Sequence, residues 1–384
     1  MTRPPHATRI DLERRRFMAV AGRYGFTTAV LAASGGILWS ERALAQSAAE
    51  EAAKQKAAKV TMLFATEYKI EDWAVYPVPQ AQFKHNLEAA SKGQIYVKLH
   101  PAGQLGIGAA LAQKVQGGTV QGGAVSLSNF SPYAPAVDLI NIPFWCGENQ
   151  RFANLVTSRA WDKEITPRVI GRGFKPIFYF TVDPRTVATR RGHKPVRTPA
   201  DMQGMKMRVP PSQLLQQFYR LAGANPTVVP WGETPTALKQ GVADGLDPAI
   251  TALAVFGFQD VLANILAVRS VPDAQMFAAN AGWYNQLNPD LKSAFDLAAA
   301  KTQAESFVQI AKARANAIAI LKKGGAQIAV PTDAEYKQWV EACGEQRKEW
   351  HDFKVKLAGS IDTFERLKEA ANTKGPITVA DFTG

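Results

Sequence analysis

The sequence contains very little cysteine: only Cys146 and Cys343 occur among its 384 residues. Two cysteines so far apart provide neither a disulfide framework nor the close ligand spacing of a metal site. We expect two separate buried thiols. One long-range disulfide stays open as an alternative, because such a bond persists in an oxidising compartment.

Catalytic motifs are missing as well. The five histidines show no paired spacing, and no H-E-x-x-H, G-x-S-x-G or P-loop lysine motif occurs. The glycine pairs at 117–118 and 122–123 do not match a phosphate cradle. We therefore expect no metal and no cofactor, although a catalytic site assembled from distant residues stays open.

The basic surplus of the chain lacks the pattern of a nucleic-acid surface. The formal net charge is +12, and the composition is 46% hydrophobic and 20% charged, as in ordinary globular proteins. No basic run with interleaved aromatic residues occurs. We expect instead a modest positive field that favours small anionic ligands.

The N-terminal segment 1–45 has the three parts of an export signal. Paired arginines at 14–15 precede a charge-free stretch at 24–40 and the cleavage pattern Ala-Leu-Ala at 43–45. The arginine pair favours the twin-arginine route, with cleavage after Ala45. The stretch is too short and too rich in glycine and serine to span a bilayer, which takes roughly 20 apolar residues. A retained anchor is the alternative, but no stop-transfer pattern follows.

The remaining chain is long enough for two domains, and short strand patterns alternate in it with helical ones. Strands are predicted at 60–65, 94–100, 120–127, 175–182, 205–209 and 225–231, and helices at 78–91, 107–116, 212–223 and 233–241. This order predicts α/β layers around a largely parallel sheet. Ligands in such folds bind beyond the carboxyl ends of the strands.

A long helix is predicted at 289–323. Asn288 is a candidate N-cap, Pro289 fits the first helical position, and no breaker follows before Gly324. Such a helix is on the order of 50 Å long, which exceeds one domain. We interpret it as a spine across both domains; a coiled coil is the alternative, but sustained heptads are lacking. Further helices are expected at 333–357 and 360–371.

Arg208 is the side chain most suited to holding an anion. It lies near the end of the strand predicted at 205–209, where Met205, Met207 and Val209 alternate with Lys206 and Arg208. A guanidinium group there can bind a carboxylate through two parallel hydrogen bonds. The alternative is a solvated arginine on a half-exposed strand.

Several segments together resemble the substrate-binding proteins of TRAP transporters, the family of the C4-dicarboxylate-binding proteins. The similar segments are 101–106, 117–126, 138–144, 199–211, 221–226, 231–238 and 241–245. The resemblance covers nearly all of the mature chain. It implies a periplasmic, non-catalytic protein with two α/β lobes that close on an organic acid and deliver it to a membrane permease.

The resemblance also implies a division of the chain. Lobe one comprises 46–182 and roughly 269–288, and lobe two comprises 183–268 and the C-terminal helices, with the helix at 289–323 spanning both. The mature protein would not itself span the membrane, and its partners would be a small carboxylate and the permease subunits. Delivery of the ligand signal to a membrane sensor is an alternative, and an exported lyase or hydrolase with Glu233 or Asp247 as base is another.

Site residues follow from the matching positions. Arg208 matches the main carboxylate-binding arginine, and Arg185 fits the second arginine, with Arg190 as its rival. The full set of candidates is Arg208, Arg185, Trp231, Asp247, Glu233, Glu67, Tyr68, Ser128 and Asn129. The last four are added because they follow the first strand and the glycine-rich strand of lobe one. Phe144 and Trp145 belong either to the pocket wall or to the core.

One position departs from the family pattern. After Asp244 and Gly245 many relatives carry an asparagine that contacts the ligand, whereas this chain has Asp247 and is one residue shorter. An acid beside a carboxylate ligand repels it unless the acid contacts a hydroxyl, an amine or a metal. The identity of the organic acid therefore stays open.

Overall fold

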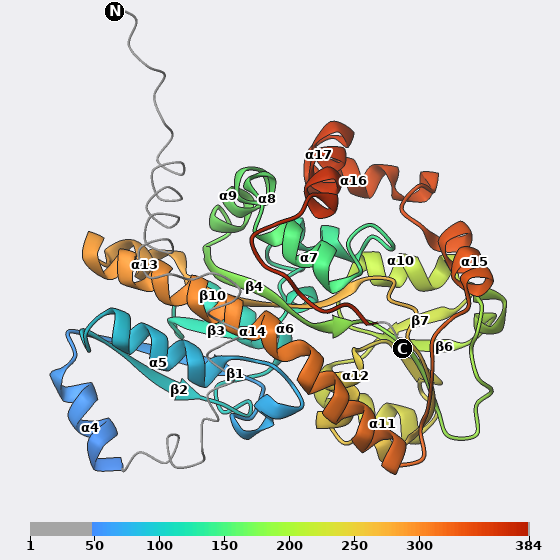
Figure 1. Cartoon of the computed structure of the whole chain (residues 1–384), viewed down its shortest axis with the longest axis horizontal. Coiled ribbons are helices and arrows are strands. Elements are labelled where there is room, and N and C mark those ends of the chain that lie inside the picture. The colour runs from blue at the N-terminus through green and yellow to red at the C-terminus, as the bar shows by residue number, and fades with distance from the viewer. Residues whose placement is uncertain (1–47, 383–384) are drawn as a thin grey trace, which may run out of the picture.

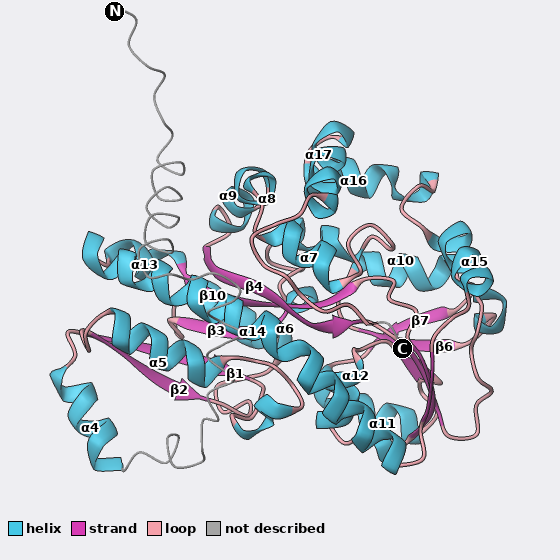
Figure 2. Cartoon of the chain, viewed as in Figure 1, coloured by secondary structure: helices cyan, strands magenta, loops and turns pink. Residues whose placement is uncertain are grey.

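The structure is a computed structural model that describes residues 48–382; the predicted signal segment 1–45 lies outside the described residues. Two β-sheets lie side by side, each with helices around it, and one long helix runs along both (Figure 1). The predicted two-lobed α/β fold is confirmed. Figure 2 shows the strands of both sheets meeting near the centre of the molecule.

The first lobe is built on a five-stranded sheet with the order β2-β1-β3-β10-β4. Its strands are β1 (Val60–Thr66), β2 (Ile95–His100), β3 (Gly122–Ser126), β4 (Phe174–Pro184) and β10 (Pro272–Asn280). Its helices are α4 (Ala48–Ala57), α5 (Gln80–Ala90), α6 (Gly108–Gln116), α7 (Asn149–Val156), α8 (Arg159–Glu164), α9 (Thr166–Ile170) and α13 (Ala281–Gln286), with 3-10 turns η1 (Glu71–Ala74), η2 (Leu127–Asn129) and η3 (Pro135–Asn141).

The second lobe is built on a six-stranded sheet with the order β11-β9-β5-β8-β6-β7. Its strands are β5 (Val187–Arg190), β6 (Lys206–Val209), β7 (Asn225–Val228), β8 (Gly245–Leu246), β9 (Leu262–Leu266) and β11 (Gln327–Ala329). Its helices are α10 (Gln213–Leu221), α11 (Thr234–Lys239) and α12 (Ile250–Val255), with 3-10 turns η4 (Pro199–Met202), η5 (Trp231–Glu233) and η6 (Phe258–Asp260).

The prediction of a largely parallel sheet was wrong, because both sheets are mixed. β10 is antiparallel to β3 and β4, and β5 is antiparallel to β8 and β9. The cause lies in the two crossings between the lobes: β4 leads directly into β5, and β9 leads back into β10. The outgoing segment β4–β5 and the returning segment β9–β10 therefore run in opposite directions. In each sheet the two strands of this pair are antiparallel neighbours.

Both crossings carry a residue with unusual backbone geometry. Asp183 at the first crossing has φ 127, and Arg269 at the second has φ 55. Such positive φ values are costly for residues other than glycine and persist only where the surroundings hold them. Asp183 forms an ion pair with Arg314 at 2.7 Å, and Arg269 forms one with Glu148 at 3.1 Å.

The predicted spine is confirmed as α14, Pro289–Lys323. The side chain of Asn288 caps it by accepting a hydrogen bond from the backbone N–H of Leu291 at 2.9 Å. The helix contacts α5 and β4 of the first lobe and α12 and β11 of the second. Figure 1 shows it running diagonally across the molecule.

The C-terminal part differs from the prediction of one helix at 333–357. It forms α15 (Asp333–Cys343), the 3-10 turn η7 (Lys348–Trp350) and α16 (His351–Ala358), followed by α17 (Ile361–Asn372). The break follows from Gly344, which has extended φ and ψ of −61 and 162 at the end of α15. α15 contacts α10, whereas α16 and α17 contact η3, α7 and α8, so the assignment of all C-terminal helices to lobe two stays a prediction.

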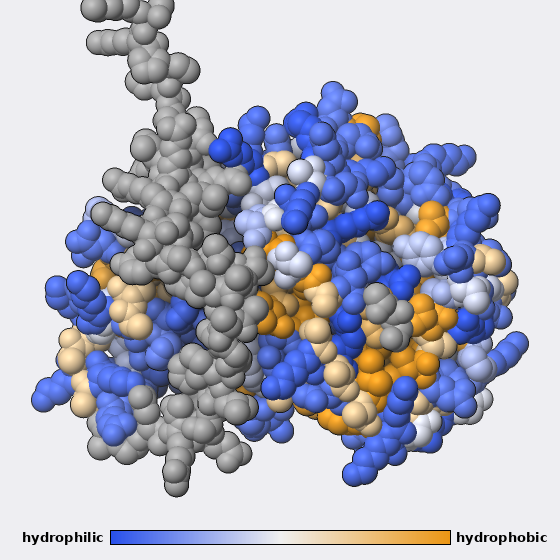
Figure 3. Space-filling model, in the orientation of Figure 1, coloured by the Kyte–Doolittle hydropathy of each residue, from blue (hydrophilic) through white to orange (hydrophobic). Residues whose placement is uncertain are grey.

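Both cysteines are free and buried, as predicted. Among the described residues, no helix is long and apolar enough to cross a membrane. On the face seen in Figure 3 hydrophilic residues dominate, and hydrophobic ones gather in the region that α12 and the C-terminal half of α14 occupy in Figure 1.

Candidate functional site

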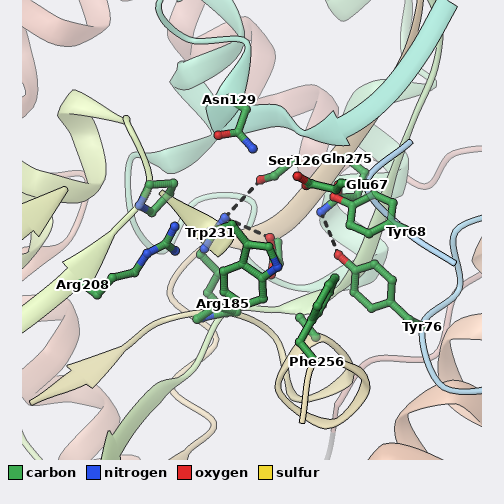
Figure 4. Close-up of a pocket in the computed structure, with 14 residues that line it drawn as sticks. Glu67, Tyr68, Tyr76, Ser126, Asn129, Arg185, Arg208, Trp231, Phe256 and Gln275 are labelled. Carbon is green, nitrogen blue, oxygen red and sulfur yellow. Dashed lines mark hydrogen bonds and ion pairs between the residues drawn. The ribbon is translucent and has the colours of Figure 1, made fainter. Parts of the chain in front are cut away.

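A polar cavity lies between the two lobes, where strands of both sheets end. Its lining residues are Glu67, Tyr68, Tyr76, Ser126, Asn129, Arg185, Arg208, Pro210, Trp231, Pro248, Ala252, Phe256, Asp273 and Gln275. Figure 4 shows these side chains converging from both lobes. The cavity volume is about 40 Å³, whereas small-molecule pockets are typically about 300–1,000 Å³. The cavity is therefore much smaller than a typical small-molecule pocket.

Arg208 presents its guanidinium group to this cavity. It is 3% exposed, and its Nε donates a hydrogen bond to the carbonyl oxygen of Val229 at 2.9 Å. The guanidinium also lies 5.2 Å from the ring centroid of Trp231, a cation–π contact. Burial lowers the pKa of Arg208 to about 10, so the group is charged at neutral pH. Its terminal nitrogens are not used in any hydrogen bond or ion pair with the described residues, and Figure 4 shows them pointing toward the centre of the site.

Arg185 is held differently. Its Nη1 lies 3.0 Å from Oδ1 of Asp247, and its Nη2 lies 2.9 Å from Oδ1 of Asp273. A third contact runs from Nη2 to the hydroxyl of Ser126 at 3.4 Å. Burial disfavours the charge of Arg185, yet Asp273 and Asp247 outweigh it and raise the pKa of this group. Arg185 is therefore a cation already paired with two anions.

Glu67, which directly follows β1, brings a second carboxyl group to the cavity lining, in addition to that of Asp273. Its Oε2 accepts a hydrogen bond from the backbone N–H of Gly108 at 2.9 Å. Burial raises the pKa of Glu67, against the opposing effect of this hydrogen bond. Gly108 itself has φ 52, a left-handed backbone conformation that glycine adopts more readily than other residues.

Aromatic side chains form one wall of the site. The hydroxyl of Tyr68 donates to Oε1 of Gln275 at 2.7 Å, and Nε2 of Gln275 donates to the hydroxyl of Tyr76 at 3.3 Å. The rings of Tyr68 and Tyr76 lie 5.0 Å apart, and that of Phe256 lies 5.9 Å from Tyr76 and 5.0 Å from Trp231. These contacts join the first lobe to the second beside Arg208.

Most of the residues expected from sequence meet in this cavity. Those that line it are Glu67, Tyr68, Asn129, Arg185, Arg208 and Trp231. Three do not line it: Ser128 is buried and accepts a hydrogen bond from Asn141, Glu233 is exposed at the start of α11, and Asp247 lies behind Arg185.

Three further residues singled out from the sequence lie elsewhere. Arg190, the rival of Arg185, pairs with Asp244 at 3.2 Å outside the cavity. Phe144 packs against Phe218, and Trp145 is 1% exposed in the core. Of the two bases considered for an enzyme, Asp247 is buried in an ion pair and Glu233 lies outside the cavity.

Sequence reasoning missed several lining residues. Asp273 and Gln275 alternate along β10, a strand that was not predicted. Two polar side chains spaced by two within an otherwise apolar run were a usable signal, because they face the same side of a strand. Tyr76 follows η1 and Phe256 follows α12. No local sequence pattern marks either residue as part of a site, because only tertiary packing brings the two together.

The arrangement suits the binding of a small polar anion. Arg208 is the lining cation with no acidic partner, while carboxylates, amides and hydroxyls around it can bind the hydroxyl groups of a ligand. The described residues contain no group of three or more His, Cys, Asp or Glu side chains that could hold a metal ion.

Comparisons with known proteins point in the same direction. Residues 79–352 match the family described as bacterial extracellular solute-binding protein, family 7. The chain is 24% identical over 265 residues to the 2,3-diketo-L-gulonate-binding periplasmic protein of Escherichia coli, covering 69% of this chain and 79% of that protein.

Solved structures share the fold. A TRAP periplasmic solute-binding protein from Roseobacter denitrificans with bound β-D-glucuronate superposes with a TM-score of 0.73 at 21% identity, covering 82% of this chain and 100% of that one. The sugar acid binding protein of Advenella mimigardefordensis in complex with galactonate also gives a TM-score of 0.73 at 21% identity, covering 82% and 98%.

Proposed function

This chain belongs to family 7 of the bacterial extracellular solute-binding proteins, and we propose that it captures a small organic acid in the periplasm for uptake by a TRAP-type permease. The family consists of binding proteins and not of enzymes. The carboxylate of the ligand would bind Arg208, and its other polar groups would contact both lobes.

The observation that carries this proposal is the state of Arg208. Its guanidinium group is buried at the edge of the cavity, positively charged and hydrogen-bonded through Nε alone. Leaving a buried charge without an opposite charge is costly. A ligand carboxylate that accepts two parallel hydrogen bonds from this group removes the cost and gains charge-assisted bonds.

The rest of the cavity suits a hydroxylated acid. Asp273, Gln275, Asn129 and Ser126 supply hydrogen-bond acceptors and donors at fixed positions. Relatives with this fold have bound β-D-glucuronate and galactonate, which are acids rich in hydroxyl groups. Trp231 and Phe256 would cover the apolar face of the carbon chain.

Capture would proceed by closure of the lobes on the ligand. The two crossings at Asp183 and Arg269 would act as the hinge, with α14 as the third connection. A ligand stabilises the closed form only through contacts that it makes in that form alone. Arg208 and Trp231 come from the second lobe and Glu67 and Gln275 from the first, so a bound acid gains such contacts from both.

Export would place the protein beside its partner. The twin-arginine signal proposed at 1–45 would direct the folded chain across the inner membrane, with cleavage after Ala45. The mature protein would then carry its ligand to the permease subunits.

The proposal is tested by identifying the ligand that the purified protein retains. The protein is isolated from the periplasm, denatured, and the released molecules are analysed by mass spectrometry. An organic acid in stoichiometric amount supports the proposal; a neutral or cationic molecule in that amount would overturn it.

Closure is tested by small-angle scattering on the same sample, with and without the identified acid. We expect the radius of gyration to decrease when the acid saturates the protein. An unchanged radius would exclude a hinged capture mechanism, even if the acid binds.

A further inference from the structure

We propose that the pair of aspartates on Arg185 restricts the site to acids with a single carboxylate and excludes the corresponding diacids. This inference rests on the proposed function, because it assumes that one ligand carboxylate occupies Arg208. It concerns what the rest of the cavity accepts. The residues that set this selectivity are Asp247 and Asp273.

The two aspartates are placed to occupy Arg185 from two sides. Asp247 and Asp273 bind different terminal nitrogens of the guanidinium, at 3.0 and 2.9 Å. All three side chains are at most 5% exposed. Asp273 is fixed further, since its Oδ2 accepts a hydrogen bond from the backbone N–H of Ala249 at 3.0 Å. Water therefore screens these charges little.

The net charge of Arg185, Asp247 and Asp273 disfavours a second ligand carboxylate beside them. Arg185 contributes one positive charge, and Asp247 and Asp273 contribute two negative charges, so the trio is negative as a whole. Glu67, which also lines the cavity, adds a carboxyl group rather than a cation. A second ligand carboxylate beside Arg185 would meet like charges in a medium of low dielectric constant.

A ligand hydroxyl group beside Arg185 is favoured where a second carboxylate is not. It can donate a hydrogen bond to a carboxylate oxygen of Asp273 and accept one from the amide of Gln275 or Asn129. The cavity thus favours a ligand with a carboxylate at one end and hydroxyl groups along the rest. Asp247, the position where the sequence departs from the family pattern, supplies half of the negative charge on Arg185.

Matched pairs of sugar acids test the inference in the wild-type protein. Gluconate and glucarate differ only at one end of the chain, as do galactonate and galactarate: the first of each pair carries a hydroxymethyl group where the second carries a carboxylate. Calorimetry on ligand-free protein should show that the better-bound monoacid exceeds its diacid at least about ten-fold in affinity, which corresponds to about 1.4 kcal/mol. Equal binding of acid and diacid would overturn the inference and leave the proposed function standing.

Variants then assign the selectivity to the aspartates. Asp247→Asn keeps an oxygen for Nη1 of Arg185 but removes one charge, so the ratio of monoacid to diacid affinity should fall several-fold. Asp273→Asn should act in the same direction and serves if the first variant fails to fold. Asp244→Asn is the matched control, because it removes a carboxylate that pairs with Arg190 outside the cavity; its ratio should stay at the wild-type value. An unchanged ratio in folded Asp247→Asn and Asp273→Asn proteins would overturn the assignment.

Different binding results would overturn the proposed function and the selectivity of the aspartates. If neither acid of either pair binds and the retained ligand is not an acid, the proposed function fails and the inference with it. If Arg208→Ala abolishes binding of the monoacid while the diacid binds the wild type equally well, only the inference fails.

Discussion

Replacing Arg208 is the perturbation with the largest expected effect on binding. Arg208→Ala removes the cation that has no acidic partner at ion-pair distance among the described residues. It also removes the hydrogen bond to Val229, the contact with Trp231 and the longer-range attraction to Asp247, Asp273 and Glu67. Arg208→Lys keeps a positive charge but loses the planar fork, and an ammonium group cannot replace the two parallel bonds to a carboxylate.

The size of the expected loss of affinity follows from the burial of Arg208. Arg208 is 3% exposed, so its pair with a ligand carboxylate would be shielded from water. Truncating one partner of such a buried charge pair typically costs about 2–5 kcal/mol, and each 1.4 kcal/mol is about ten-fold in affinity. We therefore expect Arg208→Ala to weaken binding of the acid by at least about 30-fold. Arg208→Lys should lie between the alanine variant and the wild type.

Calorimetric titration gives the affinities, and thermal unfolding without ligand reports whether each variant is folded. Arg190→Ala is the matched control, since Arg190 lies in the same lobe, pairs with Asp244 and does not line the cavity. It should bind the acid as the wild type does. Wild-type affinity in folded Arg208→Ala protein would remove Arg208 from the site and refute the reasoning.

Three further predictions concern stability and export. Burial raises the pKa of Glu67 above 4.5, so ionisation of this carboxyl group at higher pH destabilises the fold. Glu67→Gln should therefore be more thermally stable than the wild type at pH 8 but not at pH 4. An equal gain at both pH values would show that the buried charge of Glu67 is not the cause. Arg314→Ala leaves a buried aspartate at the first crossing unpaired and should lower the free energy of unfolding by about 3–5 kcal/mol in denaturant titrations, whereas Lys312→Ala on the exposed side of α14 should change it little. Arg14→Lys combined with Arg15→Lys should trap the precursor in the cytoplasm, and normal recovery from the periplasmic fraction would argue for the general export route.

The parts of the fold that local chemistry specifies could be predicted from sequence. Asn288, Pro289 and the absence of breakers before Gly324 located α14. The alternation around Arg208 located β6. In these cases the residues that determine the element are close together in the chain.

The parts of the fold and of the site that depend on contacts between distant residues could not be predicted from sequence. The antiparallel position of β10 between β3 and β4 results from the return of the chain across the lobes, and no nearby residue encodes that return. The same holds for the ion pairs of Arg185: Asp247 and Asp273 are far from it in sequence, and only the fold shows that they hold it. The sequence led us to expect a ligand contact from Asp247, whereas in the structure Asp247 pairs with Arg185 and does not line the cavity.

The central claim is that the cavity recognises a carboxylate through Arg208, and the most direct test compares an acid with its uncharged analogue. Ligand-free protein is titrated in a calorimeter with the sugar acid that the protein retains on purification, and then with the alditol of the same carbon chain, in which a hydroxymethyl group replaces the carboxylate. The account predicts saturable binding of the acid and a loss of at least about 30-fold in affinity for the alditol, the same loss that Arg208→Ala causes for the acid. Equal affinities for acid and alditol would contradict it.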